Sequence, residues 1–196
     1  NNKNLDTNEK IGFYFDGKKY FGYKGDTLAS ALLANNVHLI GRSFKYHRPR
    51  GLLSAGPEEP NGIVQLESGN VTEPNRRVTE VLLYEGLTAT SQNRWPNIKF
   101  DFGAINDFLS PFFPAGFYYK TFMWPPTFWK KYEFIIRHAA GLGKSPQSDD
   151  PHQYEYYHYH CDLIIIGSGV SGLYAAEMAA EQDLKVLLVE QEDELG

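Results

Sequence analysis

Cysteine is nearly absent from this chain of 196 residues, which has a single example at Cys161. One thiol cannot form an internal disulfide, and it cannot alone hold an iron–sulfur cluster or a cysteine-rich zinc site. The sequence therefore predicts no metal site of these kinds, and a reducing, cytoplasmic setting fits it best.

Long apolar runs and excess positive charge are also missing. No uninterrupted apolar stretch approaches the roughly 20 residues that a membrane-spanning helix needs, and residues 1–10 are polar, so we expect neither a signal peptide nor a membrane anchor. With 19 basic and 24 acidic residues, the net charge is −5. Such a chain offers no basic field for nucleic acid or an anionic membrane, and neither partner is expected.

Residues 1–94 follow the order of a small β-grasp domain of the α+β class. Asp16-Gly17 between two alternating apolar segments predicts a tight β-hairpin. Asp26 or Thr27 can cap the helix that follows. Leu28, Leu32 and Leu33 are the candidate core residues of that helix. The predicted elements are strands 11–15 and 18–23, a helix over 28–35, a long loop over 41–61, and strands 63–67 and 78–85.

Residues 95–152 form an aromatic connector. Between Trp95 and Phe134 lie 15 of the chain's 29 aromatic residues, interleaved with prolines that forbid a long regular element. We expect these rings to be exposed in this chain and to lie against another domain or subunit. A helix is predicted over 130–140, ended by Gly141 and Gly143, and residues 144–152 are the best candidate linker.

Residues 153–196 carry the opening of an α/β Rossmann domain. A buried-type strand at 162–166 leads into a GxGxxG loop, followed by a helix over 173–182 and a second strand over 185–189. Gly167 permits the tight turn, Gly169 lets the backbone approach a pyrophosphate, and Gly172 lets the helix lie close to the strand. The predicted dinucleotide-binding residues of this loop are Gly167, Ser168, Gly169, Val170, Ser171 and Gly172.

Glu190 ends the second strand, 18 residues after Gly172. An acidic side chain at this position accepts hydrogen bonds from adenosine ribose hydroxyls, which implies an unphosphorylated 2′-hydroxyl. The remaining parallel strands of such a domain are expected outside this chain. The alternative is that the strand–helix–strand unit is only a scaffold that binds no nucleotide.

Two further clusters have open interpretations. A loop in this acidic chain concentrates cations beside aromatic residues, and it is either an anion or interface site or a solvated basic loop; its candidates are Arg42, Lys45, His47, Arg48 and Arg50. His158 and His160 would share one face of a strand and could suggest a metal, but no further ligand completes a set, so structural histidines are favoured. No nucleophile and base form a recognisable pair, so no catalytic residue is predicted.

Several long strings of residues resemble the N-terminal part of the α subunits of heterotetrameric sarcosine oxidases, a group related to the α subunits of opine oxidases and hydrogen cyanide synthase. The resemblance rests on residues 41–51 (GRSFKYHRPRG), 55–61 (AGPEEPN), 91–96 (SQNRWP), 117–122 (FYYKTF), 139–143 (AAGLG) and the GxGxxG unit, and so covers nearly the whole chain. It implies that residues 1–94 resemble a 2Fe-2S ferredoxin domain that holds no cluster.

The resemblance also implies an oxidoreductase complex with β, γ and δ subunits. The complex would oxidise sarcosine to glycine with oxygen, giving peroxide and, with tetrahydrofolate, methylenetetrahydrofolate. It would hold FAD in the β subunit, FMN between α and β, and NAD on the Rossmann domain of this chain. The folate and sarcosine sites would lie outside these residues, so the chain alone is expected to be inactive. Two alternatives remain: an FAD-binding α subunit of an opine or amino-acid dehydrogenase, and a non-catalytic module that docks a partner.

Overall fold

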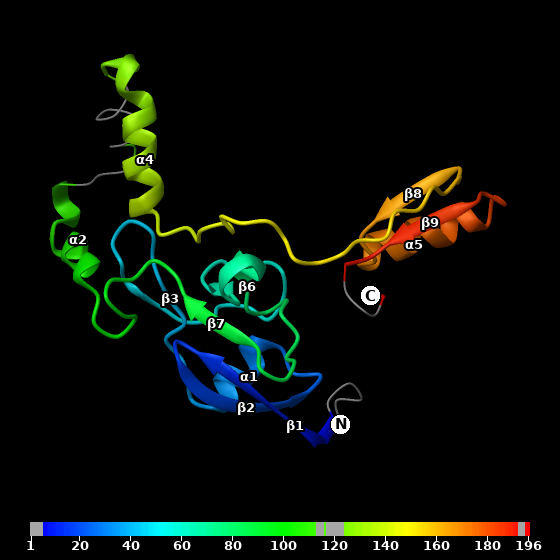
Figure 1. Cartoon of the computed structure of the whole chain (residues 1–196), viewed down its shortest axis with the longest axis horizontal. Helices are drawn as coiled ribbons and strands as arrows, with labels where there is room; N and C mark the ends of the chain where they lie inside the picture. The colour runs from blue at the N-terminus through cyan, green and yellow to red at the C-terminus, as the bar shows by residue number, and fades with distance from the viewer. Residues whose placement is uncertain (1–5, 113–115, 117–123, 192–194) are drawn as a thin grey trace. The chain divides into compact units, whose positions relative to one another are not determined.

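The computed structural model describes residues 6–112, 116, 124–191 and 195–196 (Figure 1). The chain divides into two units, Asn1–Pro151 and His152–Gly196. The connector therefore groups with the first unit. One of the strings behind the resemblance, residues 117–122, lies outside the described residues.

A five-stranded mixed sheet organises the first unit. Its order is β2-β1-β7-β5-β6, with β1 and β7 parallel and the other neighbours antiparallel. The first and last strands of the domain thus lie side by side in its interior. The bounds are β1 Asp6–Phe15, β2 Lys18–Lys24, β5 Ile63–Leu66, β6 Glu73–Arg77 and β7 Thr88–Ser91.

The hairpin and the first helix are as the sequence predicts. Asp16 and Gly17 both have positive φ, at 49° and 77°, which suits a two-residue turn between twisted strands. Helix α1, Leu28–Ala34, begins at Thr27, whose hydroxyl accepts the Ser30 amide in a capping box. The helix lies against the sheet through its apolar face, and Leu33 is exposed rather than buried. Buried residues of the sheet and helix include Phe13, Leu28, Leu32, Val64, Leu87 and Ala89.

The strand predicted over 78–85 is wrong. The adjacent strand is β6, and residues 78–83 instead run past the start of α1. The carbonyl of Val81 accepts the Leu28 amide at 2.7 Å, and that of Val78 accepts the Ala29 amide at 2.9 Å. The apolar residues of this segment are buried at Val78, Val81 and Leu83, while its backbone caps a helix end that would otherwise have unpaired donors.

The long loop between α1 and β5 contains one small ladder, β3 Gly41–Arg42 paired with β4 Pro49–Arg50, and is otherwise irregular. A short 3₁₀ turn, η1 Gly69–Val71, joins β5 to β6. Both features lie within the part that the sequence assigns to a β-grasp domain. The mixed sheet with one packed helix is the architecture expected for that domain.

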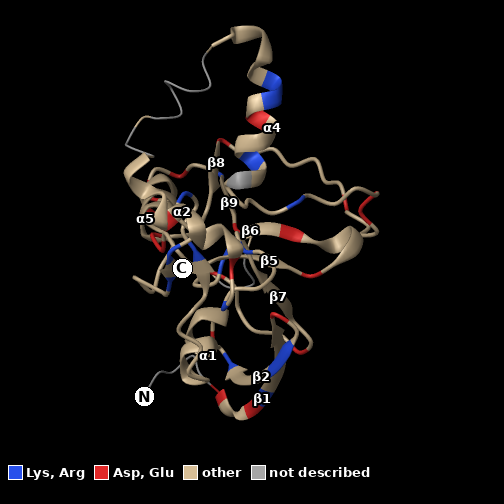
Figure 2. Ribbon diagram, turned by 90° about the vertical axis from the view of Figure 1, so that its left-hand side faces the viewer, with Lys and Arg blue, Asp and Glu red and all other residues tan. Residues whose placement is uncertain are grey.

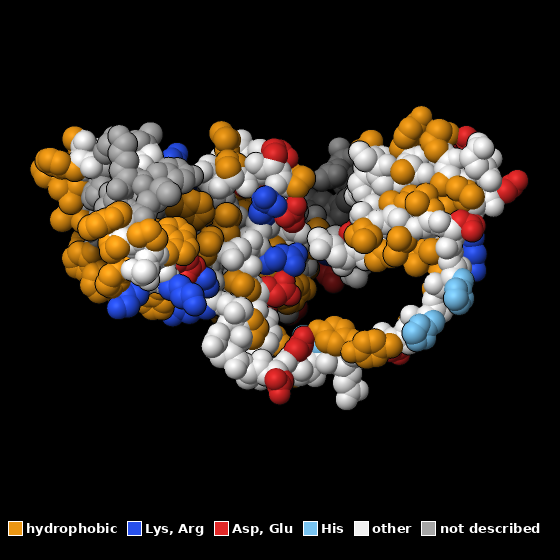
Figure 3. Space-filling model, turned by 90° about the horizontal axis from the view of Figure 1, so that it is seen from above, with side chains coloured by type: hydrophobic (Ala, Val, Ile, Leu, Met, Phe, Trp, Pro, Cys, Tyr) orange, Lys and Arg blue, Asp and Glu red, His pale blue; other side chains and the backbone are white. Residues whose placement is uncertain are grey.

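The described residues of the connector form short helical turns and one longer helix, α4, which matches the helix predicted over 130–140. The aromatic side chains described in it are largely exposed, for example Trp95 at 68% and Phe108 at 85%. Hydrophobic side chains crowd the end of the first unit that carries α2 and α4 (Figure 3). Its elements are η2 Phe102–Ala104, α2 Ile105–Phe108, η3 Ser110–Phe112, η4 Pro126–Phe128 and α4 Trp129–Ala139.

The predicted linker begins in contact with the sheet domain. Gly141, at φ 65°, follows α4, and the Gly143 amide donates to Asn75 Oδ1 at 3.0 Å. The Ser148 hydroxyl contacts the Asn70 side chain. The first part of the predicted linker therefore belongs to the first unit.

The described residues of the second unit form two parallel strands and one helix. Strand β8, Leu163–Ile166, pairs in register with β9, Val186–Val189, and α5, Val170–Ala180, connects them. The helix begins three residues earlier than predicted, so Gly172 lies inside it.

Figure 2 shows that acidic and basic residues are interspersed along the described residues of the ribbon.

Residues 151–161 have no regular secondary structure, so His158 and His160 do not share a strand face. Within the described part of the chain, no group of three potential metal ligands occurs. No helix among the same residues is long and apolar enough to span a membrane.

Candidate functional site

The predicted GxGxxG residues form one continuous turn from β8 into α5. Gly167 has φ 94°, a region that L-residues avoid, and its amide donates to the Val189 carbonyl of β9 at 2.8 Å. A Cβ added at Gly172 would lie 2.0 Å from the Gly167 carbonyl oxygen. The helix can approach the turn this closely only because residue 172 has no side chain.

Gly169 lies at the N-cap of α5 and faces open space. A Cβ built on it would meet nothing within 4 Å, and no side chain caps the helix. The first amides of a helix have no partner within it, and the helix dipole adds partial positive charge at the same end. Val170 and Ser171, also predicted for this site, are exposed at the first turn. This end of α5 is therefore open to an anionic group.

Glu190 closes the other side of the turn. One carboxylate oxygen accepts both the amide and the hydroxyl of Ser168, each at 2.6 Å, and the other accepts the Gln191 amide at 2.7 Å. Ser168 is buried, and its hydroxyl also accepts the Gly196 amide at 3.0 Å. The structure thus brings Glu190 to the glycine-rich loop from 22 residues away, as the predicted site requires.

An open helix N-terminus beside a carboxylate suits a ligand that carries a phosphate and hydroxyl donors. The helix amides can bind phosphate oxygens, and a carboxylate can accept from ribose hydroxyls. Among the described residues at this turn, no two side chains form an acid–base pair for catalysis. The geometry of the turn is compatible with a bound nucleotide.

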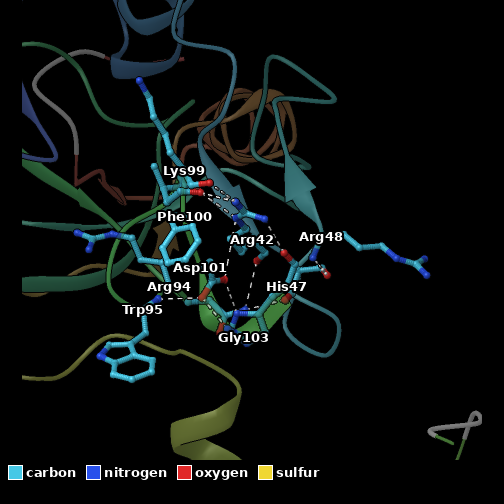
Figure 4. A network of polar contacts seen from close by, with 12 residues as sticks. Arg42, His47, Arg48, Arg94, Trp95, Lys99, Phe100, Asp101 and Gly103 are labelled. Atoms are coloured by element: carbon cyan, nitrogen blue, oxygen red, sulfur yellow. Dashed lines mark hydrogen bonds and ion pairs between the residues drawn. The ribbon is translucent and has the colours of Figure 1, made fainter. Parts of the chain in front are cut away.

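Several cations of the basic loop make contacts within the chain (Figure 4). The Arg42 guanidinium, 7% exposed, donates to the carbonyls of Ile98, Lys99 and His47 at 2.6 to 3.2 Å. His47 Nδ1 lies 2.6 Å from Asp101 Oδ2. These contacts fasten the loop to the start of the connector.

The other candidates of this loop are more exposed. Arg48 pairs with Asp107 at 2.7 Å, with both side chains about half exposed. Lys45 lies over the Tyr46 ring at 4.9 Å, and its carbonyl accepts from Asn106 at 3.3 Å. Arg50 is exposed on β4. Binding of an external anion or partner by this loop stays a prediction.

Two buried acidic residues of the first unit, Asp101 and Glu59, were not predicted from the sequence. Asp101 has a fully buried carboxylate that accepts the amides of Trp95 and Gly103, each at 3.0 Å. Glu59 is 1% exposed and lies within the long loop. Glu59 precedes Pro60 and Asp101 lies two residues before Gly103, and neither pattern is rare enough to single out a buried acid.

Comparisons with known protein families assign both units. Residues 8–94 match the family described as 2Fe-2S iron-sulfur cluster binding domain, and residues 165–196 match the NAD(P)-binding Rossmann-like domain. No cysteine occurs in residues 8–94, since the single cysteine is Cys161. The ferredoxin-like and Rossmann-like assignments predicted from the sequence are therefore confirmed.

Curated relatives match along nearly all of the chain. It is 56% identical over 188 residues to sarcosine oxidase subunit alpha of Rhizobium meliloti (strain 1021), which covers 95% of this chain and 19% of the relative. It is 30% identical over 195 residues to the subunit of the same name from Corynebacterium sp. (strain P-1), covering 98% of this chain and 15% of that protein.

Among solved structures, the L-proline dehydrogenase from P. horikoshii overlaps 96% of this chain and 26% of its own, at 20% identity and a TM-score of 0.43. That likeness is too distant to bear on function. The sequence matches to proteins named sarcosine oxidase subunit alpha confirm the predicted resemblance. The chain, which spans less than a fifth of those relatives, is a homologue of the N-terminal region of sarcosine oxidase subunit alpha.

Proposed function

We propose that the second unit binds NAD through residues 167–172 and Glu190, as part of an oxidoreductase subunit. The observation that carries this proposal is the uncapped N-terminus of α5 behind the open position at Gly169. A pyrophosphate can approach the backbone there because no side chain intervenes. The match to an NAD(P)-binding family over residues 165–196 supports the same ligand class.

Glu190 favours NAD over NADP. Its carboxylate lies at the loop, where it can accept from a ribose 2′-hydroxyl but would repel a 2′-phosphate. FAD carries the same unphosphorylated adenosine ribose, so an FAD-binding subunit of the opine or amino-acid dehydrogenase type is the alternative. When bound, either cofactor would supply electron transfer that the side chains of this chain cannot.

Calorimetry on the whole chain with NAD⁺, NADP⁺ and FAD tests the proposal. We expect NAD⁺ to bind and NADP⁺ to bind at least about tenfold more weakly. Gly169→Ala keeps an allowed backbone, at φ −60°, and fills only open space, so it should fold yet weaken binding by about tenfold or more. Glu177→Gln, on an exposed part of α5, is the matched control.

Two results would overturn the assignment. One is equal binding of NAD⁺ by Gly169→Ala and Glu177→Gln, because the ligand would then lie elsewhere. The other is binding of none of the three nucleotides by a folded wild-type chain, which would favour the scaffold alternative. Tighter binding of FAD than of NAD⁺ would select the dehydrogenase-type subunit.

For the whole protein we propose the sarcosine oxidase reaction, with β, γ and δ subunits, FAD and FMN elsewhere in a cytoplasmic complex, and folate as the acceptor of the one-carbon unit. The identity with the two subunits named sarcosine oxidase subunit alpha supports it. The complete complex should release peroxide from sarcosine, and tetrahydrofolate should add methylenetetrahydrofolate as a product. No peroxide from sarcosine would refute this reaction, and the separate chain is expected to be inactive.

We also propose that the ferredoxin-like domain holds no iron–sulfur cluster. Such clusters are bound by cysteine thiolates, and residues 8–94 contain no cysteine.

A subunit-docking role is favoured for the connector by its exposed rings, among them Trp124 at 79% and Phe112 at 78%. That role fits an α subunit whose chemistry takes place on its partners.

A further inference from the structure

The long loop of the ferredoxin-like domain folds around a buried carboxylate. Glu59 is 1% exposed, and its two oxygens accept four backbone amides. One oxygen accepts from Leu53 and Ser54, each at 2.7 Å, and the other accepts from Asn61 at 2.7 Å and Gly62 at 3.2 Å. The side chain thus joins both ends of an irregular segment of ten residues, 53–62.

This site is built for a negative charge. Among the described residues, no lysine, arginine or histidine forms a salt bridge with Glu59, so its charge is balanced by backbone N–H dipoles and by the Ser54 hydroxyl, which donates to it at 3.5 Å. Burial would raise the pKa of the Glu59 carboxyl, but the amides of Ser54, Asn61, Leu53 and Gly62 outweigh it and lower the pKa. Donors that converge on one point repel a cation, so the same site does not suit a metal ion.

The Glu59 loop packs closely against the neighbouring chain at Gly62. A Cβ at Gly62 would lie 2.6 Å from Val78 Cγ2 and 2.8 Å from Leu52 Cδ2. The Val78 amide donates to the Gly62 carbonyl at 2.9 Å, and Thr79 Oγ1 donates to the Gly56 carbonyl at 2.8 Å. The Glu59 loop is therefore fastened to the turn that caps α1.

We propose that the Glu59 carboxylate is the resident anion of this domain and organises the loop as an iron–sulfur cluster organises its binding loop in cluster-bearing members of the matched family. A 2Fe-2S cluster with four thiolates is a net negative group whose sulfurs accept hydrogen bonds from the protein. Here a single side chain supplies negative charge and acceptor atoms, and backbone amides supply the donors. The inference rests on the proposed absence of a cluster and adds the residue that replaces its structural role.

Amide hydrogen exchange on the whole chain tests the role of Glu59. Glu59→Gln has nearly the same shape but loses the negative charge, and its NH₂ group faces two of the four amide donors. At least two of the amides of Leu53, Ser54, Asn61 and Gly62 should therefore exchange about tenfold faster or more than in the wild type. Glu58→Gln, at the exposed neighbouring residue, should leave all four unchanged.

Titration gives a second readout. The folded-state pKa of Glu59 lies below its usual value of 4.5, so its contribution to stability is complete above that value and is lost as the pH falls through the folded pKa. The difference in urea midpoint between wild type and Glu59→Gln should therefore be large at pH 7 and should shrink in acid.

The outcomes separate the two claims. Equal exchange of the four amides in Glu59→Gln and Glu58→Gln would overturn the role of Glu59. Failure of Glu59→Gln to fold while Glu58→Gln folds would support it, since the two changes are chemically the same. Iron and acid-labile sulfide, near two of each per chain in the purified wild type, would instead refute the absence of a cluster.

Discussion

Asp101 gives the sharpest test of how the connector is held to the ferredoxin-like domain. Its carboxylate is fully buried, accepts the amides of Trp95 and Gly103, and lies 2.6 Å from His47 Nδ1 and 4.0 Å from Arg42 Nε. Asp101→Asn keeps one oxygen for the two amides but removes the negative charge beside a buried guanidinium. We expect the free energy of unfolding to fall by about 2–3 kcal/mol, within the range for a hydrogen bond to a charged group.

Two features of the network set that magnitude. Removing one partner of a buried ion pair usually costs about 3–5 kcal/mol, because the other charge is left uncompensated. Arg42 still has the carbonyls of Ile98, Lys99 and His47 as acceptors, so the cost should stay below that range. Asp101→Ala also leaves the Trp95 amide without its acceptor, and its cost should reach about 3–5 kcal/mol.

Asp107→Asn is the matched control. Its pair with Arg48 has nearly the same bond length, 2.7 Å, but both side chains are about half exposed, so the loss should be under about 1 kcal/mol. Urea unfolding followed by tryptophan fluorescence measures both, because the three tryptophans of the chain lie between residues 95 and 129. Equal losses for Asp101→Asn and Asp107→Asn would refute the reasoning that burial sets the cost.

Three further perturbations test the fold. Thr27→Ala removes the side-chain cap of α1 and should cost about 1 kcal/mol in urea unfolding, whereas Thr27→Ser should cost only a small part of this; equal losses would count against the cap. Phe13→Ala empties a fully buried site beneath the sheet and should cost about 3–5 kcal/mol, and a loss below about 1 kcal/mol would contradict the assigned core. The pKa of the Tyr84 phenol is raised mainly by burial and also by its hydrogen bond to Glu67. The stability linked to this phenol is therefore complete below the usual tyrosine pKa of 10.0 and is lost as the pH rises through the folded-state pKa. Tyr84→Phe should therefore weaken the alkaline loss of stability in the urea midpoint measured from pH 9 upward, and an unchanged alkaline profile would speak against the raised pKa.

Features coded by neighbouring residues were predictable from the sequence. The turn at Asp16-Gly17 needs positive φ at adjacent positions, and the glycine-rich loop after β8 needs its glycines at fixed offsets, so both could be recognised in short windows. The position of Glu190 could be predicted for the same reason. Its contact with Ser168 follows from parallel pairing of the two strands.

Features that depend on distant partners could not be predicted. The apolar residues over 78–85 indicate burial of Val78 and Val81, but nothing local tells whether their carbonyls face a strand or the end of a helix. Arg42 looked available for an external anion because two of its three carbonyl acceptors, Ile98 and Lys99, lie 56 and 57 residues further along the chain. Glu59 escaped notice because its partners are backbone amides, which every sequence has.

The parallel pairing of β1 with β7 has a consequence for the order in which the domain can form. Tyr14 and Phe15 find their partners only at Thr88 and Ala89, and the Asp16 carboxylate accepts the amide of Ser91 at 2.8 Å. During synthesis the opening hairpin, which ends at Lys24, must therefore wait for more than sixty further residues before its inner edge is covered at Thr88. A shorter piece that ends before β7 should expose that edge and associate with copies of itself, as unpaired strand edges do.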